Sequence, residues 1–562
     1  MDFQMFLDIA TVALRVLMPI YAIFIIYQCF ASMRRQRRPE KPLVTLEIKN
    51  TGQKLPVLFW ENSIGRSKGS DIVIADSTVS RDHCVLLRRA EGWFVSDIGS
   101  KAGTYVNGEE AVGRVKVLID DEITVGTTTL VLKRGEEYNE KIRSSWFFSK
   151  ASDKGSLQPY KLMLLITFFH LFMAVEACFS NEVQDFVPLY VFGAFAVISW
   201  MFFLVSSFAF NRVNFELEAL GLFLSGIGVM LLVRQELRSA FVQMIAMTIG
   251  LILYSFLVKF IENPDRVNSW RLAIMIGAVG LLAINLVFGR VQNGAANWIN
   301  IGGISVQPSE FVKIAFIFVG ASALDRLQTK RNFIEFIIFS AICVGALALM
   351  GDFGTALIFF ATFILIAFMR SGDFKTLILA LAAAVFGGVI VLKFKPYVAD
   401  RFAAWGHVWE NAQGAAYQQA RTLTYTASGG LFGVGTGNGY MKYIFASESD
   451  LVFGLVAEEL GVIIAFAIAI TIVALAFYSR AVTTRSRSTF YSISACCAAG
   501  LMVIQTALNI FGSTDILPLT GVTLPFISAG GSSIISCWGL LAFIKAADER
   551  TYSQKRILRK ED

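Results

Sequence analysis

The sequence has little charge: only 17% of its 562 residues are Asp, Glu, Lys or Arg, whereas 55% are hydrophobic. A soluble globular protein has more polar surface than this composition supplies, so it is typical of a membrane protein with many spans. The 49 Phe and 45 Gly agree, because aromatic side chains meet lipid and small residues let helices approach closely. The net charge is +7, and in a membrane protein such an excess of basic residues is expected in the cytoplasmic loops. The charge therefore does not indicate a nucleic-acid partner, and we predict none.

Metal-type cysteine spacings and a cleavable leader are also lacking. The seven cysteines show no paired spacing, and we interpret the adjacent Cys496 and Cys497 as helix-packing residues rather than a redox pair. The first apolar run, at about 6–30, is too long for the apolar part of a signal peptide and has no small-residue cleavage site. We therefore predict that residues 1–32 are retained as a membrane anchor.

Further apolar runs between residues 161 and 546 bring the predicted total to about thirteen spans. The loops test this arrangement, because cytoplasmic loops carry an excess of Lys and Arg. Basic residues follow the first span and recur in nearly every loop predicted to be cytoplasmic, with Arg234 to Arg238 as the exception. The pattern predicts that the N-terminus and the 396–450 loop lie outside, and that the basic tail at 548–562 is cytoplasmic.

Residues 40–135 interrupt the apolar pattern. Short β-branched and aromatic segments alternate there with turn residues, which is typical of an all-β sandwich. The charge pattern places this domain in the cytoplasm. A mixed-charge stretch at 136–160 is predicted to link the sandwich to the membrane part.

Three blocks of this region resemble the forkhead-associated (FHA) domain family, in its order and spacing: 64–67 (IGRS), 80–83 (SRDH) and 97–108 (DIGSKAGTYVNG). The resemblance implies binding of a phosphothreonine-containing protein, made by a Ser/Thr kinase, through loops at one end of the sandwich. Arg66 and Arg81 can form charge-assisted hydrogen bonds with the phosphate, and Ser80 supplies a hydroxyl donor. Lys101 completes the predicted site, and His83 is expected to support its loop.

Ala102 departs from this family pattern. The family usually has Asn at this position, where it contacts the peptide backbone. The replacement of this Asn by Ala102 predicts weaker binding of the phosphopeptide or a different peptide preference. The alternative interpretation is that the domain serves only for docking.

The loop at 396–450 ends at a carboxylate. A loop of this length among short ones is often functional. Asp450 lies where the loop meets the apolar run that begins at Leu451. A carboxylate at this depth is costly to place unless it is used, so Asp450 is the first candidate for chemistry.

Five blocks between residues 210 and 547 resemble the SEDS family (shape, elongation, division and sporulation), whose members include RodA, FtsW and SpoVE. They stand in family order: NWI at 297–299 with QPSE at 307–310; GDFGTA at 351–356; YQ at 417–418 with GGLFG at 429–433; 450–461; and LPFIS at 524–528 with GGSS at 530–533. The family core has about ten spans. Two extra spans at 161–208 and the anchor make up the predicted thirteen.

The resemblance implies a function and a site. SEDS proteins are peptidoglycan glycosyltransferases that polymerise lipid II at the outer face of the bacterial cytoplasmic membrane, together with a class B penicillin-binding protein. The family's essential Asp corresponds to Asp450. The family commonly has a Pro and a His where this chain has Phe445 and Glu448. We expect Glu448 either to raise the Asp450 pKa by like-charge repulsion or to share a divalent cation, Mg²⁺ or Mn²⁺, with it.

Polymerisation joins a sugar hydroxyl to an anomeric carbon and expels a lipid diphosphate. A β-linked product from an α-linked donor requires inversion in a single displacement, which needs a general base and positive charge at the leaving group. Asp450 is the candidate base, with a role as helix cap as the alternative. Arg401 and Lys442 are candidates for the diphosphate, unless they are ordinary loop charges.

Other polar residues complete the predicted site. Gln418 and Glu448 are included as substrate-binding residues, and Asp352 as either a site wall or a helix cap. Glu310 and Lys313, three residues apart, are expected to pair. Glu458 and Glu459 do not stack below Asp450 on a helix, so we predict structural pairing for them.

Two other functions remain open from the residues alone. A lipid II flippase would also place charged groups in a bundle, although a carrier needs polar residues along its whole path. A non-catalytic scaffold would recruit partners through the FHA domain. The sequence does not distinguish elongation, division and sporulation.

Overall fold

The structure is a computed structural model that describes residues 3–35, 44–134 and 158–551, apart from gaps within these ranges. The gaps are 58–59, 68–69, 90, 181–183, 209–213, 293–294, 302–303, 324–329, 484–487, 549–550 and most positions between 372 and 394. Nearly all of the predicted linker at 136–160 and of the tail at 548–562 lies outside the described residues. So does most of the predicted span at 374–395.

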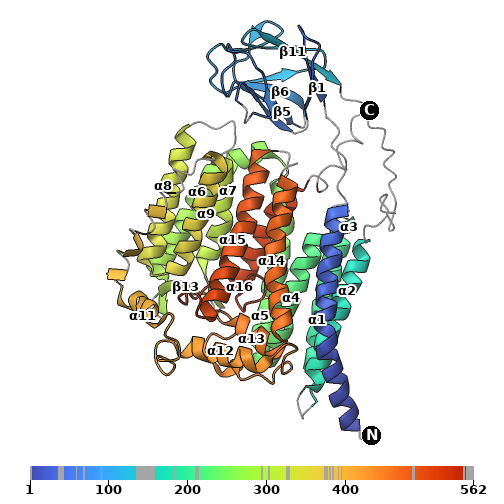
Figure 1. Cartoon of the computed structure of the whole chain (residues 1–562), viewed down its shortest axis with the longest axis vertical. Coiled ribbons are helices and arrows are strands. Elements are labelled where there is room, and N and C mark those ends of the chain that lie inside the picture. Colours follow the sequence, from blue (N-terminus) through green and yellow to red (C-terminus); the bar gives the residue numbers. More distant parts are fainter. Residues whose placement is uncertain are drawn as a thin grey trace.

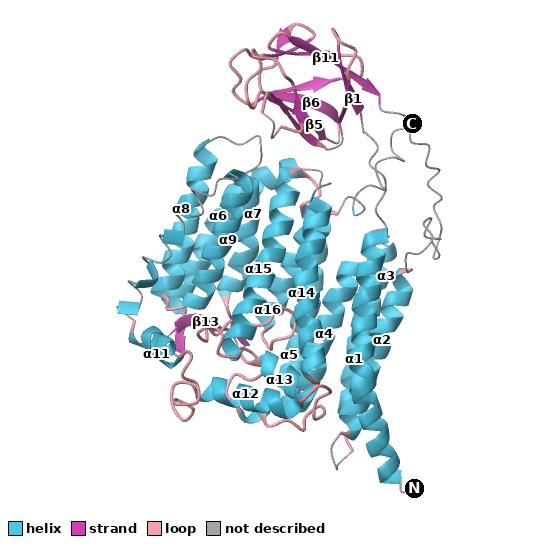
Figure 2. Cartoon of the chain, in the orientation of Figure 1, coloured by secondary structure: helices cyan, strands magenta, loops and turns pink. Residues whose placement is uncertain are grey.

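The membrane part is a bundle of long apolar helices with the sandwich beyond one end (Figures 1 and 2). Among the described residues, eight helices are long and apolar enough to cross a membrane, and three shorter apolar helices accompany them. A polytopic helical protein with an all-β domain is therefore confirmed. The helices of the bundle core are α4 (Glu216–Gln235), α5 (Leu237–Phe260), α6 (Pro264–Phe288), α7 (Pro308–Ala323), α8 (Lys330–Leu349), α9 (Phe353–Ser371), α14 (Val462–Thr483), α15 (Thr489–Ser513) and α16 (Gly531–Ala547).

Three further helices stand beside this core: α1 (Phe3–Arg35), α2 (Pro159–Phe179) and α3 (Val187–Phe208). Helix α1 packs against α2, α4 and α14, and α2 packs against α4 (Figure 1). Buried apolar side chains such as Met18, Ile25 and Phe169 belong to the same cluster as the core helices. The three added helices are thus part of the folded bundle rather than a separate anchor.

The predicted span at 451–478 is divided, which corrects the expectation of one continuous helix. Helix α13 (Val452–Glu459) ends at Leu460, and α14 begins at Val462. Gly461 has φ +93°, and a Cβ there would overlap the Leu431 carbonyl. Only glycine fits this turn, which lets α13 remain in the layer of α12 while α14 runs through the bundle.

The end of the bundle opposite the sandwich carries a layer of short elements (Figure 1). A three-stranded antiparallel sheet in the order β12-β13-β14 lies between α6 and α7 in the chain. The remaining elements come from the long loop and lead to Asp450. The elements of the layer are β12 (Arg290–Gln292), β13 (Ala295–Ile301), β14 (Ile304–Val306), α11 (Pro396–Ala404), α12 (Tyr417–Gly429), the 3₁₀ helix η1 (Met441–Tyr443) and α13.

The sandwich has two sheets, in the orders β2-β1-β11-β10-β7-β8 and β4-β3-β5-β6-β9. Its core contains inward-facing residues from both, including Leu46, Leu86 and Leu130. The strands are β1 (Val44–Ile48), β2 (Lys54–Val57), β3 (Glu61–Gly65), β4 (Ile72–Val73), β5 (Cys84–Arg89), β6 (Gly92–Asp97), β7 (Thr104–Val106), β8 (Glu109–Glu110), β9 (Arg114–Val117), β10 (Glu122–Val125) and β11 (Thr128–Arg134).

Polar interactions between described residues join the sandwich to the bundle. The Glu61 carboxylate accepts a hydrogen bond from the Thr489 backbone N–H at 3.0 Å, at the start of α15. Arg114 pairs with Asp265, at the start of α6, at 2.7 Å. A carboxylate at a helix N-terminus satisfies a free N–H group and complements the helix dipole.

Candidate functional site

Asp450 lies at the end of a tight turn in the layer of short elements. The Ala446 carbonyl accepts backbone hydrogen bonds from Ser449, Asp450 and Leu451, at 3.1 to 3.2 Å. The Asp450 carbonyl accepts from Asn509 Nδ2, on α15, at 2.9 Å. Asp450 lies two residues before α13, whose N-cap position is Leu451.

The loop between α15 and α16 fixes the backbone on the other side of this turn. Ser528 Oγ donates to the Ser449 carbonyl at 2.6 Å, and the Ala529 N–H donates to the Glu448 carbonyl at 2.8 Å. Asn509 Nδ2 also donates to Val522 in that loop, at 2.7 Å. The position of Asp450 therefore depends on segments far away in the sequence.

The Asp450 side chain is half-buried against Gly521. A Cβ on Gly521, which has φ +69°, would lie 3.3 Å from Asp450 Oδ2. Burial raises the pKa of the Asp450 carboxyl, a Ser449 hydrogen bond and the Arg401 charge lower it, and the Asp352 charge raises it. The result is a carboxyl with a pKa above its ordinary value, which makes it a stronger base once deprotonated.

Arg401 comes from α11 and is held at the same loop. Its Nη1 donates to the Leu519 carbonyl at 3.0 Å, two residues before Gly521. The side chain is half-buried, and its charge acts on Asp450. The structure thus places Arg401 close enough to Asp450 for its charge to act on that carboxyl.

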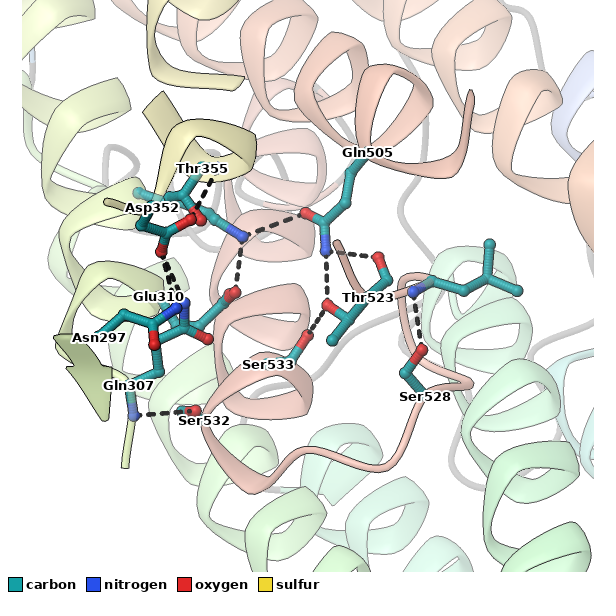
Figure 3. Close-up of polar contacts among 12 residues, drawn as sticks. Asn297, Gln307, Glu310, Asp352, Thr355, Gln505, Thr523, Ser528, Ser532 and Ser533 are labelled. Carbon is teal, nitrogen blue, oxygen red and sulfur yellow. Dashed lines mark hydrogen bonds and ion pairs between the residues drawn. The ribbon is translucent and has the colours of Figure 1, made fainter. Parts of the chain in front are cut away.

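Asp352 caps α9, which is one of the two roles predicted for this residue. Its Oδ1 accepts from the Thr355 N–H at 3.1 Å. Its Oδ2 accepts from Asn297 Nδ2 at 3.1 Å and from Gln307 Nε2 at 3.2 Å (Figure 3). The like charge that raises the Asp450 pKa belongs to Asp352 and not, as predicted, to Glu448.

A buried polar network continues from there into the bundle (Figure 3). Lys313 pairs with Glu310 at 2.7 Å, as predicted from their spacing, and donates to Gln505 Oε1 at 3.2 Å. Gln505 Nε2 donates to the carbonyl and the hydroxyl of Thr523, each at 2.9 Å. Thr523 Oγ1 lies 2.8 Å from Ser533 Oγ. The network ties α7 and α15 to the loop that contacts Asp450.

Sequence reasoning missed Gln505, Asn509 and Gly521. Gln505 and Asn509 are polar residues four apart within an apolar run, so they share one face of α15. Polar residues in a span are expensive and mark a network, and this signal was available. The closeness of Gly521 to Asp450 was not, because it depends on the fold of the loop.

Three predicted substrate-binding residues lie elsewhere in the layer. Gln418 Nε2 donates to the Phe445 carbonyl at 2.9 Å, which attaches α12 to the turn before Asp450. Lys442 Nζ donates to the Gly437 carbonyl at 2.7 Å and lies over the Tyr443 ring. Glu448 is half-buried, and burial followed by the charge of Glu236 raises its pKa.

Glu458 and Glu459 have structural partners, as predicted. The Glu458 carboxylate accepts from the N–H groups of Tyr440 and Met441, each at 2.8 Å. Glu459 Oε1 accepts from Gln235 Nε2 at 2.8 Å. Both residues hold the segment before Asp450 rather than contribute to its chemistry.

The site was also tested for a divalent cation. No group of three or more His, Cys, Asp or Glu side chains is close enough to hold a metal in the described part of the chain. Asp352 already accepts three hydrogen bonds. The described residues around Asp450 do not form a ready-made site for Mg²⁺ or Mn²⁺.

The predicted phosphopeptide residues lie together at one end of the sandwich. The Arg66 N–H donates to the Ser80 carbonyl at 2.9 Å, and the Ser67 N–H donates to the Arg81 carbonyl at 3.1 Å. The Lys101 N–H donates to Ser80 Oγ at 3.0 Å. Arg66, Arg81 and Lys101 are exposed, and these backbone contacts place three cationic residues beside Ser80 at one end of the sandwich.

His83 is buried and supports these loops. Its Nδ1 accepts from the Ser80 N–H at 3.1 Å, and its Nε2 lies 3.0 Å from the Gly103 carbonyl. This agrees with the expected supporting role. Ala102 is exposed next to Gly103, at the position where the family usually has Asn.

A family model described as cell cycle protein, for FtsW, RodA and SpoVE, matches residues 219–553. The chain belongs to this family. A second model, for the FHA domain, matches residues 62–126. The match to the FtsW/RodA/SpoVE family begins within α4, so α1, α2 and α3 lie outside it, whereas Asp450, Arg401 and Asp352 lie inside it.

Family members with curated names give the context. The probable peptidoglycan glycosyltransferase FtsW of Buchnera aphidicola (subsp. Acyrthosiphon pisum) is 31% identical over 293 residues, which cover 50% of this chain and 73% of that protein. The peptidoglycan glycosyltransferase RodA of Mycobacterium tuberculosis is 28% identical and covers 57% and 75%. A solved structure of a peptidoglycan synthase complex that coordinates polymerization and crosslinking includes a chain with a similar fold, at TM-score 0.50 and 24% identity over 58% of this chain and 95% of that one.

Proposed function

We propose that this protein is a peptidoglycan glycosyltransferase that polymerises lipid II into glycan strands at the outer face of the bacterial cytoplasmic membrane. The observation that carries the proposal is the half-buried Asp450 carboxylate, with its raised pKa, beside the charge of Arg401. The relatives named as peptidoglycan glycosyltransferases support the reaction class. The proposed activity is equally compatible with a role in cell elongation, division or sporulation.

In the proposed reaction, Asp450 acts as the general base. The acceptor hydroxyl of one lipid-linked sugar transfers its proton to the Asp450 carboxylate, and its oxygen attacks the anomeric carbon of the second sugar. The bond from that carbon to the lipid diphosphate breaks, and the electron pair leaves with the diphosphate. Inversion follows from this single displacement, and the positive charge of Arg401 stabilises the leaving group.

Other parts of the predicted site are placed around this pair. Lys442 and Gln418 lie in the layer above the turn and are proposed to contact the substrate's headgroup rather than its reacting atoms. Asp352 and Glu448 are proposed to line the site at its edges. A divalent cation brought by the diphosphate stays a prediction.

The membrane orientation follows from the charge pattern. We propose that the layer with Asp450 and the N-terminus are outside, and that the FHA domain and the C-terminal tail are cytoplasmic. The sandwich and the Asp450 layer lie at opposite ends of the bundle (Figure 1), as this orientation requires. A class B penicillin-binding protein is proposed as the partner that cross-links the glycan.

The FHA domain is proposed to bind a phosphothreonine-containing protein made by a Ser/Thr kinase. The exposed residues Arg66, Arg81 and Lys101 lie near Ser80 on neighbouring loops, which suits a phosphate with several acceptor oxygens. Binding would report kinase activity to the polymerase. Equal affinity of the full-length chain for a phosphorylated and an unphosphorylated peptide would contradict this role.

The test of the enzymatic proposal is polymerisation of labelled lipid II by the purified full-length chain, with Asp450→Asn as the variant. We expect a loss of about 10²–10⁴-fold in rate, the usual contribution of a general base, with unchanged thermal stability. A flippase would instead move lipid II across vesicles and form no glycan. A scaffold would support wall growth in cells with Asp450→Asn but not with Arg66→Ala.

A further inference from the structure

The segment from residue 433 to 443, called here the approach segment, precedes the Asp450 turn and is held from two sides. On the core side, the backbone N–H groups of Val434 and Gly435 donate to the Glu458 and Glu459 carbonyls of α13, at 2.9 and 3.0 Å. The Glu458 carboxylate accepts from two more N–H groups of the segment. The segment therefore packs along α13, the helix that begins immediately after Asp450.

On its other side, the approach segment is held by α2. Glu176 Oε2 accepts from the Thr436 N–H at 3.3 Å and from the Thr436 hydroxyl. Ser180 Oγ donates to the Thr436 carbonyl at 2.7 Å, and Asn438 Nδ2 donates to the Ser180 carbonyl at 2.9 Å. All polar groups of the Thr436 residue are thus bound to the outer end of one added helix.

Helix α1 completes this arrangement. Arg15 Nε pairs with Glu176 Oε1 at 2.9 Å, and the Glu176 side chain is only 1% exposed. Both residues lie among apolar residues of long helices, where an unpaired charge is expensive. The pair orients the carboxylate so that its second oxygen faces Thr436, because the first is occupied by the guanidinium.

We propose that Arg15, Glu176 and Ser180 position the approach segment, and through it the turn that carries Asp450. Glu176 is a positioning residue: it contacts neither Asp450 nor the reacting atoms. The added helices α1 to α3 would then contribute to catalysis from outside the family-matched part of the chain. The proposal adds positioning residues to the proposed polymerase site, and its kinetic test rests on that proposed function.

The neighbouring contacts agree with a holding role for α2. Arg234, at the end of α4, donates to the Ala177 carbonyl of α2 at 2.9 Å and pairs with Asp185 at 3.0 Å. Gln235 binds Glu459. The outer ends of α2 and α4 and the end of α13 are therefore joined by polar contacts around the approach segment.

The test compares three variants of the purified full-length chain. Glu176→Gln removes the carboxylate, and Thr436→Val removes only the hydroxyl that it binds, leaving the Arg15 pair intact. Ser32→Ala is the matched control: Ser32, at the other end of α1, donates to the buried Glu216 carboxylate of α4 at 2.9 Å, away from the approach segment. Two readouts are used, hydrogen exchange of the peptides covering 433–450 and the kinetics of lipid II polymerisation.

We expect Glu176→Gln and Thr436→Val to speed exchange at 433–443 at least tenfold and to lower kcat at least tenfold, with KM for lipid II changed less than twofold. Ser32→Ala should leave both unchanged. Unchanged exchange at 433–443 in Glu176→Gln would overturn the proposal, and so would faster exchange spread over all of α1 to α3, which indicates a folding role. If the wild-type chain makes no glycan, the polymerase proposal fails, while the exchange result still decides the positioning role.

Discussion

Replacing Lys313 by Met should destabilise the bundle, because it leaves the Glu310 carboxylate buried without its cation. The two charged atoms lie 2.7 Å apart, and the side chains are 1% and 5% exposed. Removal of one partner from a buried pair costs about 3–5 kcal/mol, and loss of the Lys313–Gln505 hydrogen bond adds about 1 kcal/mol. We therefore expect the free energy of unfolding to fall by about 4–6 kcal/mol.

The measurement is unfolding of the purified chain in mixed micelles with increasing dodecyl sulfate, followed by tryptophan fluorescence. The double variant Glu310→Gln/Lys313→Met carries no buried charge at this position and should recover at least half of the lost stability. Lys259→Met is the control, because Lys259 is 58% exposed in its pair with the partly exposed Glu262, and its loss should change stability by less than about 1 kcal/mol. A Lys313→Met variant within about 1 kcal/mol of the wild type, or a double variant no more stable than the single one, would refute the reasoning.

Three further predictions concern the two sites. The polymerisation rate should rise with pH as Asp450 loses its proton, and a profile of kcat against pH measures this rise. Asp352→Asn removes a charge that raises the Asp450 pKa and should move the rise to lower pH, whereas Arg401→Gln removes a charge that lowers this pKa and should move the rise to higher pH. Shifts in the opposite directions would contradict the assignment of Asp450 as the base. Gly521→Ala places a methyl group 3.3 Å from Asp450 Oδ2 and should lower kcat roughly tenfold or more without reducing protein yield. Ala102→Asn should lower the Kd of a phosphothreonine peptide for the full-length chain by about fivefold, because it adds about one hydrogen bond. Fluorescence anisotropy measures this affinity, and the affinity for the unphosphorylated peptide should not change.

The hydrophobic periodicity and the composition of the sequence were sufficient to predict the two-part architecture of a helical bundle and a β-sandwich. Long apolar runs predicted the bundle, and short alternating segments predicted the sandwich, because each pattern reflects one local period. The division at Gly461 was not predictable in the same way. Residues 451–478 are apolar apart from Glu458 and Glu459, and the turn depends on the approach of the Leu431 carbonyl from another segment.

The candidate site was predicted residue by residue but not in its connections. Asp450 stood out as a carboxylate at the start of an apolar run, and Arg401 as a cation in the same loop. Their electrostatic neighbour Asp352 lies about one hundred residues earlier in the chain, whereas Glu448, only two residues away, does not act on the Asp450 pKa. Nearness in sequence was misleading because the turn at Ala446 directs the two carboxylates to different surroundings.

Charge counting failed at one loop, and the structure gives the reason. Arg234 is predicted to lie outside, against the rule that basic residues remain in the cytoplasm. It pairs there with Asp185 and binds the Ala177 carbonyl, so its charge is compensated within the protein. The Arg15–Glu176 pair is compensated in the same way, across 161 residues of sequence. The rule that basic residues remain in the cytoplasm applies to charges in loops exposed to water. It does not apply to a charge that is paired with a residue of another helix. Such paired charges hold the layer around Asp450 together.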